Sequence, residues 1–296
     1  MMATIQWYPG HMAKAFRQIK EKLKYIDIFI ELVDARIPWS SKNPQLEEIS
    51  ANKPTLLVLQ KADLADHKIT TQWLNYYRTN GQPAIAIDVN DVKVNKLITK
   101  AVLNVLDGQI NSQINKGIQN EIIHAVICGI PNVGKSTLLN RLINKKVAKT
   151  GNKPGVTKKE QWLKVNDKLQ ILDTPGVLWP KFSDQTIGLK LSLIGSIKDS
   201  LFAKDDAVLF LFASLRKQQK LSVIFNRYHL NDDLTSLSNV DLLLNITKKL
   251  GYKDDYDRAC ENIINDLRKG KLGKISLDLV DDLESNDINE TNIERN

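Results

Sequence analysis

GIPNVGKS, residues 129–136, follows the apolar run IIHAVIC (122–128) and precedes a segment with helical spacing. It matches the pattern G-x4-G-K-[ST], in which glycines let the backbone curl so that successive N–H groups point at phosphate oxygens. The N-terminus of the following helix adds its positive end. We therefore expect Lys135 to reach the β- and γ-phosphates of a nucleotide and Ser136 to bind Mg²⁺. The nucleotide-binding residues predicted in this stretch are Asn132, Val133, Gly134, Lys135, Ser136 and Thr137.

A second phosphate-side motif, DTPG (173–176), ends the strand-like run KLQIL. The Asp173 carboxylate is suited to hold Mg²⁺ through water, and the Gly176 N–H to sense the γ-phosphate and couple its loss to loop movement. Thr157, in KPGVTK (153–158), is the expected second side-chain ligand of Mg²⁺. The simpler alternatives are a surface turn for DTPG and an ordinary loop hydroxyl for Thr157.

QKAD (60–63) follows the apolar run TLLVLQ and resembles the guanine-recognition pattern N/T-K-x-D. In that pattern the aspartate accepts hydrogen bonds from guanine N1–H and the exocyclic amine, which adenine does not offer. Gln60 stands where asparagine is usual and is one methylene longer, so its contact with the base stays open. The predicted ligand is GTP or GDP, and the residues predicted for its base are Gln60, Lys61 and Asp63.

The base motif precedes the phosphate motifs, the reverse of the common GTPase order. Apolar runs at 27–33, 55–60, 84–87 and 122–128 alternate with helical stretches, which predicts an α/β fold with a mainly parallel, doubly wound sheet. Ligand sites in such sheets gather at the carboxyl ends of the strands, whatever order the chain visits them. A circularly permuted P-loop GTPase domain is therefore expected, with residues 91–120 as the linker. Asp88, after the third run, is assigned to the base side by position.

Composition changes beyond residue 180, where glycine thins out and leucine-rich segments dominate. The predicted domains are a GTPase domain with a basic N-terminal arm over 1–178, a smaller all-helical domain over 179–282 and an acidic, disordered tail over 283–296. The chain has 296 residues, two cysteines, no apolar run long enough to span a bilayer and no apolar secretory leader. We expect it to be cytoplasmic.

The formal net charge of +8 makes a polyanionic partner plausible. Basic side chains concentrate on one face of a predicted amphipathic helix over 12–26 and again near residue 270. A charge run is more often a solvated surface, so RNA binding and simple solvation are the two alternatives. The candidate RNA contacts are Lys14, Arg17, Arg268, Lys269, Lys271 and Lys274.

These motifs together resemble the circularly permuted GTPases, and closely the bacterial ribosome biogenesis GTPase A family. The resemblance covers most of the chain: QWYPGHMAKA (6–15), DARIP (34–38), QKAD, GIPNVGKS, PGVTK, DTPG with LWPK after it, and LRKGKLGKISLD (267–278). It implies a GTPase domain followed by a helical domain that acts in late assembly of the large (50S) ribosomal subunit precursor and contacts its rRNA. We expect a monomer with no membrane or DNA partner.

Val177 stands directly after DTPG, where Ras-like enzymes carry the glutamine that orients the attacking water. Intrinsic hydrolysis is therefore expected to be slow and to be stimulated by a partner. His11 is the candidate replacement, since the matching histidine of the family is the proposed water-positioning group; capping a helix or contacting RNA is the alternative. Asn132 is a candidate K⁺ ligand by the same resemblance, or else a turn residue. The competing function is a nucleotide-gated RNA-binding module with negligible hydrolysis.

Overall fold

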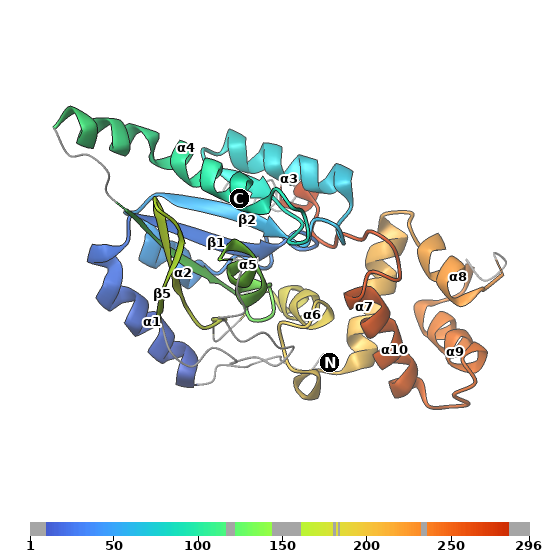
Figure 1. Ribbon diagram of the computed structural model, residues 1–296. Helices are drawn as coiled ribbons and strands as arrows, with labels where there is room; N and C mark the ends of the chain where they lie inside the picture. The colour runs from blue at the N-terminus through green and yellow to red at the C-terminus, as the bar shows by residue number, and fades with distance from the viewer. Residues whose placement is uncertain are drawn as a thin grey trace, which may run out of the picture. The chain divides into compact units, whose positions relative to one another are not determined.

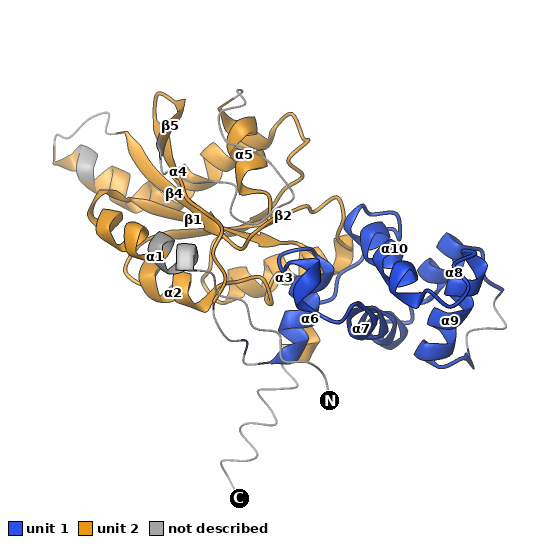
Figure 2. Ribbon diagram, turned by 90° about the horizontal axis from the view of Figure 1, so that it is seen from below, with its two compact units in different colours: residues 1–7, 181–277 blue, residues 8–180, 278–296 orange. Residues whose placement is uncertain are grey.

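The computed structural model describes residues 10–116, 122–143, 161–179, 182, 184–231 and 236–283. The chain divides into two compact units (Figure 2). Tyr8–Pro180 and Asp278–Asn296 form the larger unit, and Met1–Trp7 and Lys181–Leu277 form the smaller one.

The larger unit is built on a sheet whose described strands run in the order β3-β2-β1-β4-β6-β5. Every neighbouring pair is parallel except β5 and β6. The mainly parallel sheet predicted from the sequence is thereby confirmed. The strands are β1 (Ile28–Asp34), β2 (Thr55–Gln60), β3 (Ala84–Ala86), β4 (Ile123–Gly129), β5 (Gln161–Asn166) and β6 (Leu169–Asp173).

Helices cover both faces of this sheet: α4 and α5 lie on one face, and α1, α2 and α3 on the other (Figures 1 and 2). The chain moves outward from β1 to β3 and then returns through α4 to β4, so right-handed crossovers place the two groups of helices on opposite faces. The switch point lies between β1 and β4, where ligands of such sheets bind. The helices are α1 (Gly10–Lys22) with the 3-10 turn η1 (Leu23–Tyr25), α2 (Pro44–Ser50), α3 (His67–Thr79), α4 (Val94–Asn115) and α5 (Lys135–Leu142).

The core of the larger unit explains why these strands are almost wholly apolar. All seven residues of β1 are buried, because β1 has a strand on each side and helices above and below. Trp73 of α3 is fully buried in a cluster with Val33, Leu57 and Leu59. At the end of β4, a Cβ on Gly129 would lie 2.4 Å from the Leu32 carbonyl oxygen, so only glycine fits beside β1.

The smaller unit is helical, as the sequence predicted. The amphipathic helix α10 packs against α6, α7 and α9, and α6 packs against α7. None of the helices in the described part of the chain is both long and apolar enough to cross a membrane. The described elements are α6 (Gln185–Leu193), the 3-10 turn η2 (Asp199–Leu201), α7 (Lys204–Lys217), α8 (Ser222–Tyr228), α9 (Asn239–Lys249) and α10 (Tyr256–Arg268).

The chain returns to the larger unit at Asp278, whereas the sequence analysis assigned residues 179–282 to the helical domain. Side chains from this return segment, residues 278–283, pack against the cluster around Trp73: Leu279, Val280 and Leu283. A local sequence pattern does not reveal this, because the partners are more than 200 positions away. The linker expected over 91–120 is mostly the helix α4, and residues 284–296 of the predicted tail lie outside the described residues.

Candidate nucleotide-binding site

The loop between β4 and α5 has the backbone that its glycine pattern predicts. Gly134 has φ +111° at the N-cap of α5, and Asn132 has φ +58°. Both values lie in the left-handed region, which turns the chain sharply between the strand and the helix. The Gly134 carbonyl accepts the N–H of Leu138 at 2.9 Å, so α5 starts directly from the loop. The loop therefore presents its N–H groups and the helix N-terminus at the carboxyl edge of the sheet.

Lys135 is buried at the start of α5. Its Nζ donates to the carbonyl oxygens of Gly129 at 3.0 Å and Ile130 at 2.8 Å. Burial lowers the pKa of Lys135 to about 8, a shift that the Asp173 carboxylate opposes. A cation held in a low-dielectric loop gains strongly from a nearby phosphate, which is the role predicted for Lys135.

Asp173 ends β6 beside this lysine and is also buried. Burial raises its pKa to about 6, although the Lys135 charge opposes the shift. Its Oδ1 has no hydrogen-bond partner among the described residues. An ionised carboxylate that keeps an accepting oxygen is a suitable ligand for Mg²⁺ or its bound water, so the residues present fit that ion. Ser136, half-buried in the first turn of α5, is the other predicted ligand of that ion that the structure describes; Thr157 lies outside the described residues.

The DTPG segment lies directly against the P-loop. The Val177 N–H donates to the Gly129 carbonyl at 3.2 Å. A Cβ on Gly176 would lie 2.8 Å from Lys135 Nζ and 2.9 Å from Pro131 Cα, so the position has no room for a side chain. Its backbone is thus placed beside Lys135, the lysine predicted to bind the phosphates, where the predicted γ-phosphate contact requires it.

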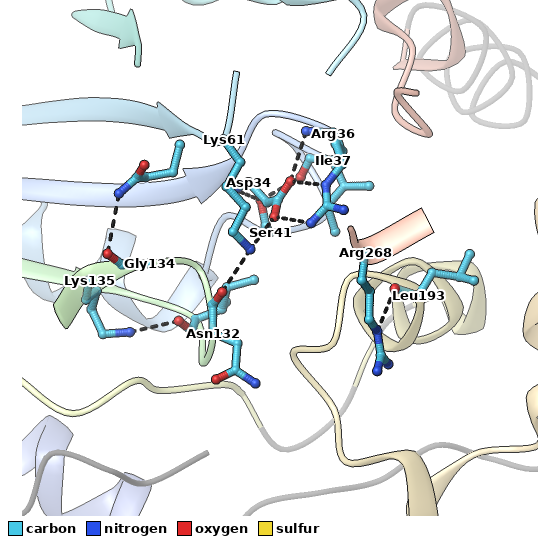
Figure 3. A network of polar contacts seen from close by, with 12 residues as sticks. Asp34, Arg36, Ile37, Ser41, Lys61, Asn132, Gly134, Lys135, Leu193 and Arg268 are labelled. Carbon is cyan, nitrogen blue, oxygen red and sulfur yellow. Dashed lines mark hydrogen bonds and ion pairs between the residues drawn. The ribbon is translucent and has the colours of Figure 1, made fainter. Parts of the chain in front are cut away.

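The base motif reaches the P-loop through two side chains (Figure 3). Lys61, in the left-handed conformation with φ +60°, donates from Nζ to the Asn132 carbonyl at 2.9 Å. The longer Gln60 directs its Nε2 to the Gly134 carbonyl at 3.4 Å. The sequence analysis left the contact of Gln60 open, and this geometry ties its amide nitrogen to the phosphate loop. Two motifs 71 positions apart in the chain are therefore held together.

The other predicted base residues lie in neighbouring loops. Asp63 is exposed, and Asp88 is half-buried with Oδ1 accepting the Asn90 N–H at 2.8 Å. The Ala62 N–H donates to the Ile87 carbonyl at 3.1 Å, which joins the two loops. Their placement at one edge of the sheet is the arrangement that the sequence order predicted.

Known proteins match this chain over almost its whole length. The family model described as "50S ribosome-binding GTPase" matches residues 124–271. Ribosome biogenesis GTPase A of Bacillus cereus is 44% identical over 282 residues, covering 93% of this chain and 94% of the relative. The protein of the same name from Priestia megaterium is 45% identical over 278 residues, covering 93% and 96%. The chain belongs to the ribosome biogenesis GTPase A family.

A solved structure agrees with the fold. GNP-bound YlqF from T. maritima superimposes with a TM-score of 0.62 at 24% identity, covering 90% of this chain and 98% of that one. At this identity the likeness supports the fold alone. As a member of the ribosome biogenesis GTPase A family, the protein is a GTP-binding GTPase, and the P-loop fold and the permuted order inferred from the sequence are confirmed.

Three residues of the GTPase site were not singled out from the sequence, although DARIP was part of the resemblance. Asp34 ends β1 and pairs with Lys61 of the base motif, Arg36 pairs with Asp34, and Asn43 donates from Nδ2 to the Val177 carbonyl at 3.0 Å. The available signal was an acidic residue at the end of a strand-like run, with an arginine two positions later. Such polar residues at the carboxyl end of a central parallel strand point to the ligand edge of the sheet.

The predicted RNA-binding residues are not equivalent in the structure. Lys269, Lys271 and Lys274 are exposed, as is Arg17 on α1. Arg268 instead donates to the Leu193 and Ser192 carbonyls and pairs with Asp199, so its guanidinium is used inside the helical unit. The side chains of His11 and Lys14 lie outside the described residues.

Proposed function

We propose that this GTPase is a switch in late assembly of the large (50S) ribosomal subunit and that the subunit precursor stimulates its hydrolysis. The observation that carries the proposal is the single site joined by Lys61 and the Asn132 carbonyl, 2.9 Å apart, which sets a guanine motif beside a phosphate loop. Membership of the ribosome biogenesis GTPase A family supports the ribosomal partner.

The test is multiple-turnover GTP hydrolysis with and without purified 50S particles and, separately, with 30S particles. We expect 50S particles alone to raise kcat; stimulation in other GTPases reaches about 10⁵-fold. No turnover under any condition, with tight GTP binding retained, supports the competing function of a nucleotide-gated RNA-binding module. Equal stimulation by both particles contradicts the 50S assignment.

Val177 favours this dependence on a partner. It is buried, and its only polar groups are backbone ones, of which the N–H donates to Gly129 and the carbonyl accepts from Asn43. The side chain at this position therefore has no means of orienting water. We propose His11 for that role, tested by comparing His11→Ala with wild-type in the presence of 50S particles. Loss of stimulated turnover with unchanged particle binding supports it, and an unchanged kcat contradicts it.

Two ions are part of the proposal. Mg²⁺ would be held by Ser136, Thr157 and Asp173 and would neutralise phosphate charge; K⁺ would bind at Asn132. The left-handed backbone of Asn132 supports a sharply turned, ligand-facing position. The test of the K⁺ site compares GTPase rates in K⁺ and Na⁺ at one ionic strength. Equal GTPase rates in K⁺ and Na⁺ would contradict a K⁺ site at Asn132.

The exposed lysines support contact with rRNA. Lys269, Lys271 and Lys274 lie at the end of α10 and in the turn after it, with half-exposed Gly270 and exposed Gly273 between them. Lysines there neutralise phosphates, so binding should weaken steeply with salt. Arg17 and Lys14 on α1 are proposed as a second contact. Crosslinking to 50S precursors in the presence of a non-hydrolysable GTP analogue tests both, and crosslinks confined to other surfaces would refute them.

A further inference from the structure

Lys61 connects three parts of the nucleotide site through one ammonium group. Its Nζ donates to the Asn132 carbonyl of the P-loop at 2.9 Å and to Asp34 Oδ2 at 3.0 Å (Figure 3). The backbone of Lys61 is in the left-handed region, where a non-glycine residue is held only by its surroundings. Asp63 lies two residues later in the same loop.

Asp34 is fully buried at the end of β1, and four hydrogen bonds saturate its carboxylate. Arg36 donates to Oδ1 from its backbone N at 3.1 Å and from Nε at 2.8 Å, and to Oδ2 from Nη2 at 2.8 Å. Lys61 supplies the fourth bond. Burial acts to raise the pKa of this carboxyl, but the charges of Arg36 and Lys61 outweigh it and hold the pKa well below its usual range. Asp34 is thus ionised at neutral pH.

Arg36 is almost fully buried, and its fork matches the carboxylate of Asp34 in a bidentate pair. One carboxylate facing two cations leaves an excess positive charge in a region with little water. Burial acts to lower the pKa of Arg36, but the charge of Asp34 and its hydrogen bond outweigh it, with a smaller contribution from Asp63. Burial lowers the pKa of Lys61, a shift that Asp34 opposes and Asp63 opposes less. The exposed Asp63 is the residue predicted to bind guanine.

We propose that Asp34 and Arg36 are positioning residues for guanine specificity, which hold Lys61 between the two loops and so fix Asp63 against the Watson–Crick edge of the base. This inference rests on the guanine site of the proposed function. It differs from a purely structural role, because one bond of the Asp34 carboxylate joins it to Lys61 in the base loop, and the bonds from Arg36 hold that carboxylate in place.

The test compares binding of GDP and inosine diphosphate by calorimetry in wild-type and Asp34→Asn proteins. Inosine lacks the exocyclic amine, so the ratio of the two Kd values reports the contact of Asp63 with that group. Wild-type should prefer GDP by about 10- to 100-fold, the value of a charge-assisted hydrogen bond. In Asp34→Asn we expect that preference to fall to within about threefold, because Lys61 loses its charged partner.

Arg36→Lys is the second variant, since lysine keeps the charge but loses the bidentate fork. Its preference for GDP over inosine diphosphate should also fall, but by less than in Asp34→Asn. If Asp34→Asn does not fold, Arg36→Lys decides the question. The matched control is Glu31→Gln, a buried acid on the same strand that accepts the Asn43 N–H; it should keep the wild-type ratio.

The binding data distinguish failure of the positioning role from failure of the guanine site itself. Equal loss of GDP and inosine diphosphate affinity in both variants, with the preference intact, overturns the positioning role. A collapsed preference with a thermal midpoint close to wild-type supports it. If wild-type itself binds neither nucleotide, or binds both equally, the guanine site fails and the positioning role fails with it.

Discussion

Ser40 and Asp278, 238 positions apart, are joined by two hydrogen bonds of 2.7 Å: the backbone N and the Oγ of Ser40 each donate to the Asp278 carboxylate. Trp73 Nε1 also donates to the Asp278 carbonyl at 3.1 Å. The chain that leaves the helical unit is therefore fixed on the loop after β1. The same loop carries Asn43, which binds the Val177 carbonyl just before the chain enters the helical unit. One loop of the larger unit thus contacts Val177 and Asp278, the residues of that unit on either side of the segment 181–277.

Asp278→Ala should loosen this anchor. The substitution leaves the buried Ser40 N–H without its acceptor, which costs about 1–3 kcal/mol of the free energy of unfolding. Amide exchange over residues 278–283 should rise with it. The control is Asp281→Ala, an exposed acid three residues along the same segment. If urea denaturation and exchange give the same values for both variants, the two short hydrogen bonds do not anchor the segment.

Gly176→Ala should impair the response to the γ-phosphate. The added methyl meets Lys135 Nζ at 2.8 Å and the P-loop backbone at Pro131 Cα at 2.9 Å, so the DTPG segment must move away. We expect affinity for a non-hydrolysable GTP analogue to fall about tenfold or more relative to GDP, a loss of roughly 1.4 kcal/mol. Nucleotide titrations with each ligand measure the ratio.

Gly108→Ala is the matched control for that substitution. Gly108 lies within α4, and a Cβ added there would have nothing within 4 Å, so alanine fits without a clash. It should raise stability by up to about 1 kcal/mol through helix propensity and leave nucleotide affinities unchanged. A similar change in the GTP-to-GDP ratio in both variants would show that the effect at Gly176 is not steric.

Glu31→Gln should change how stability depends on pH. Burial raises the pKa of Glu31 from 4.5 to about 7, although its bond from the Asn43 N–H opposes the shift. Between those values the native state binds more protons than the unfolded state, so the contribution of Glu31 to stability is greatest below pH 4.5 and is lost as pH rises through 7. The charged form costs roughly 3 kcal/mol above that range.

Glutamine keeps an acceptor for the Asn43 N–H and cannot ionise. The variant should therefore be more stable than wild-type at about pH 8 and nearly equal to it at about pH 4.5. Urea midpoints at the two values give the difference. A gap between variant and wild-type that does not change with pH would mean that Glu31 is not the titrating group.

Much of the nucleotide site was predictable, because each motif follows a buried strand and parallel strands end at one edge of a sheet. The pattern of β4 and GIPNVGKS indicated the P-loop, and the order of QKAD before it indicated the permutation. The roles of Asp34 and Arg36 were not predictable, since a polar pair after a strand has many possible partners. Only the fold shows that Lys61 is the partner of Asp34.

The sequence pattern also did not predict the packing of the return segment or the bonds of Arg268, because their partners are distant in the chain. Asp278 has its partner at Ser40, and Arg268 has its partners at Ser192 and Leu193, both far away in the chain. Charge runs report composition, but which cation is already bonded depends on tertiary contacts. The structure therefore divides a basic cluster that looked uniform in the sequence.

The difference between Arg268 and the exposed lysines leads to two predictions. The Arg268 guanidinium donates to the carbonyls of Ser192 and Leu193, which end α6, and pairs with Asp199 at 2.7 Å. Arg268→Gln removes the guanidinium donor of the Leu193 carbonyl, while the Ser192 carbonyl still accepts the Gly195 N–H at 3.0 Å, so the free energy of unfolding should fall by about 1–3 kcal/mol. Affinity for 50S particles, measured where the variant is fully folded, should stay close to wild-type.

Replacing the three exposed lysines together with glutamine should instead weaken binding to 50S particles and leave stability nearly unchanged. These lysines are Lys269, Lys271 and Lys274. Lys271 pairs with Asp266 at 3.4 Å through a half-exposed side chain, so stability should change by less than about 1 kcal/mol. Binding to 50S particles should weaken, and the slope of log affinity against log salt should fall by about 2 to 3. Titrations at several salt concentrations measure that slope. The assignment of phosphate contact to the exposed lysines is wrong if the triple variant keeps the wild-type slope and Arg268→Gln lowers it by about 2 to 3.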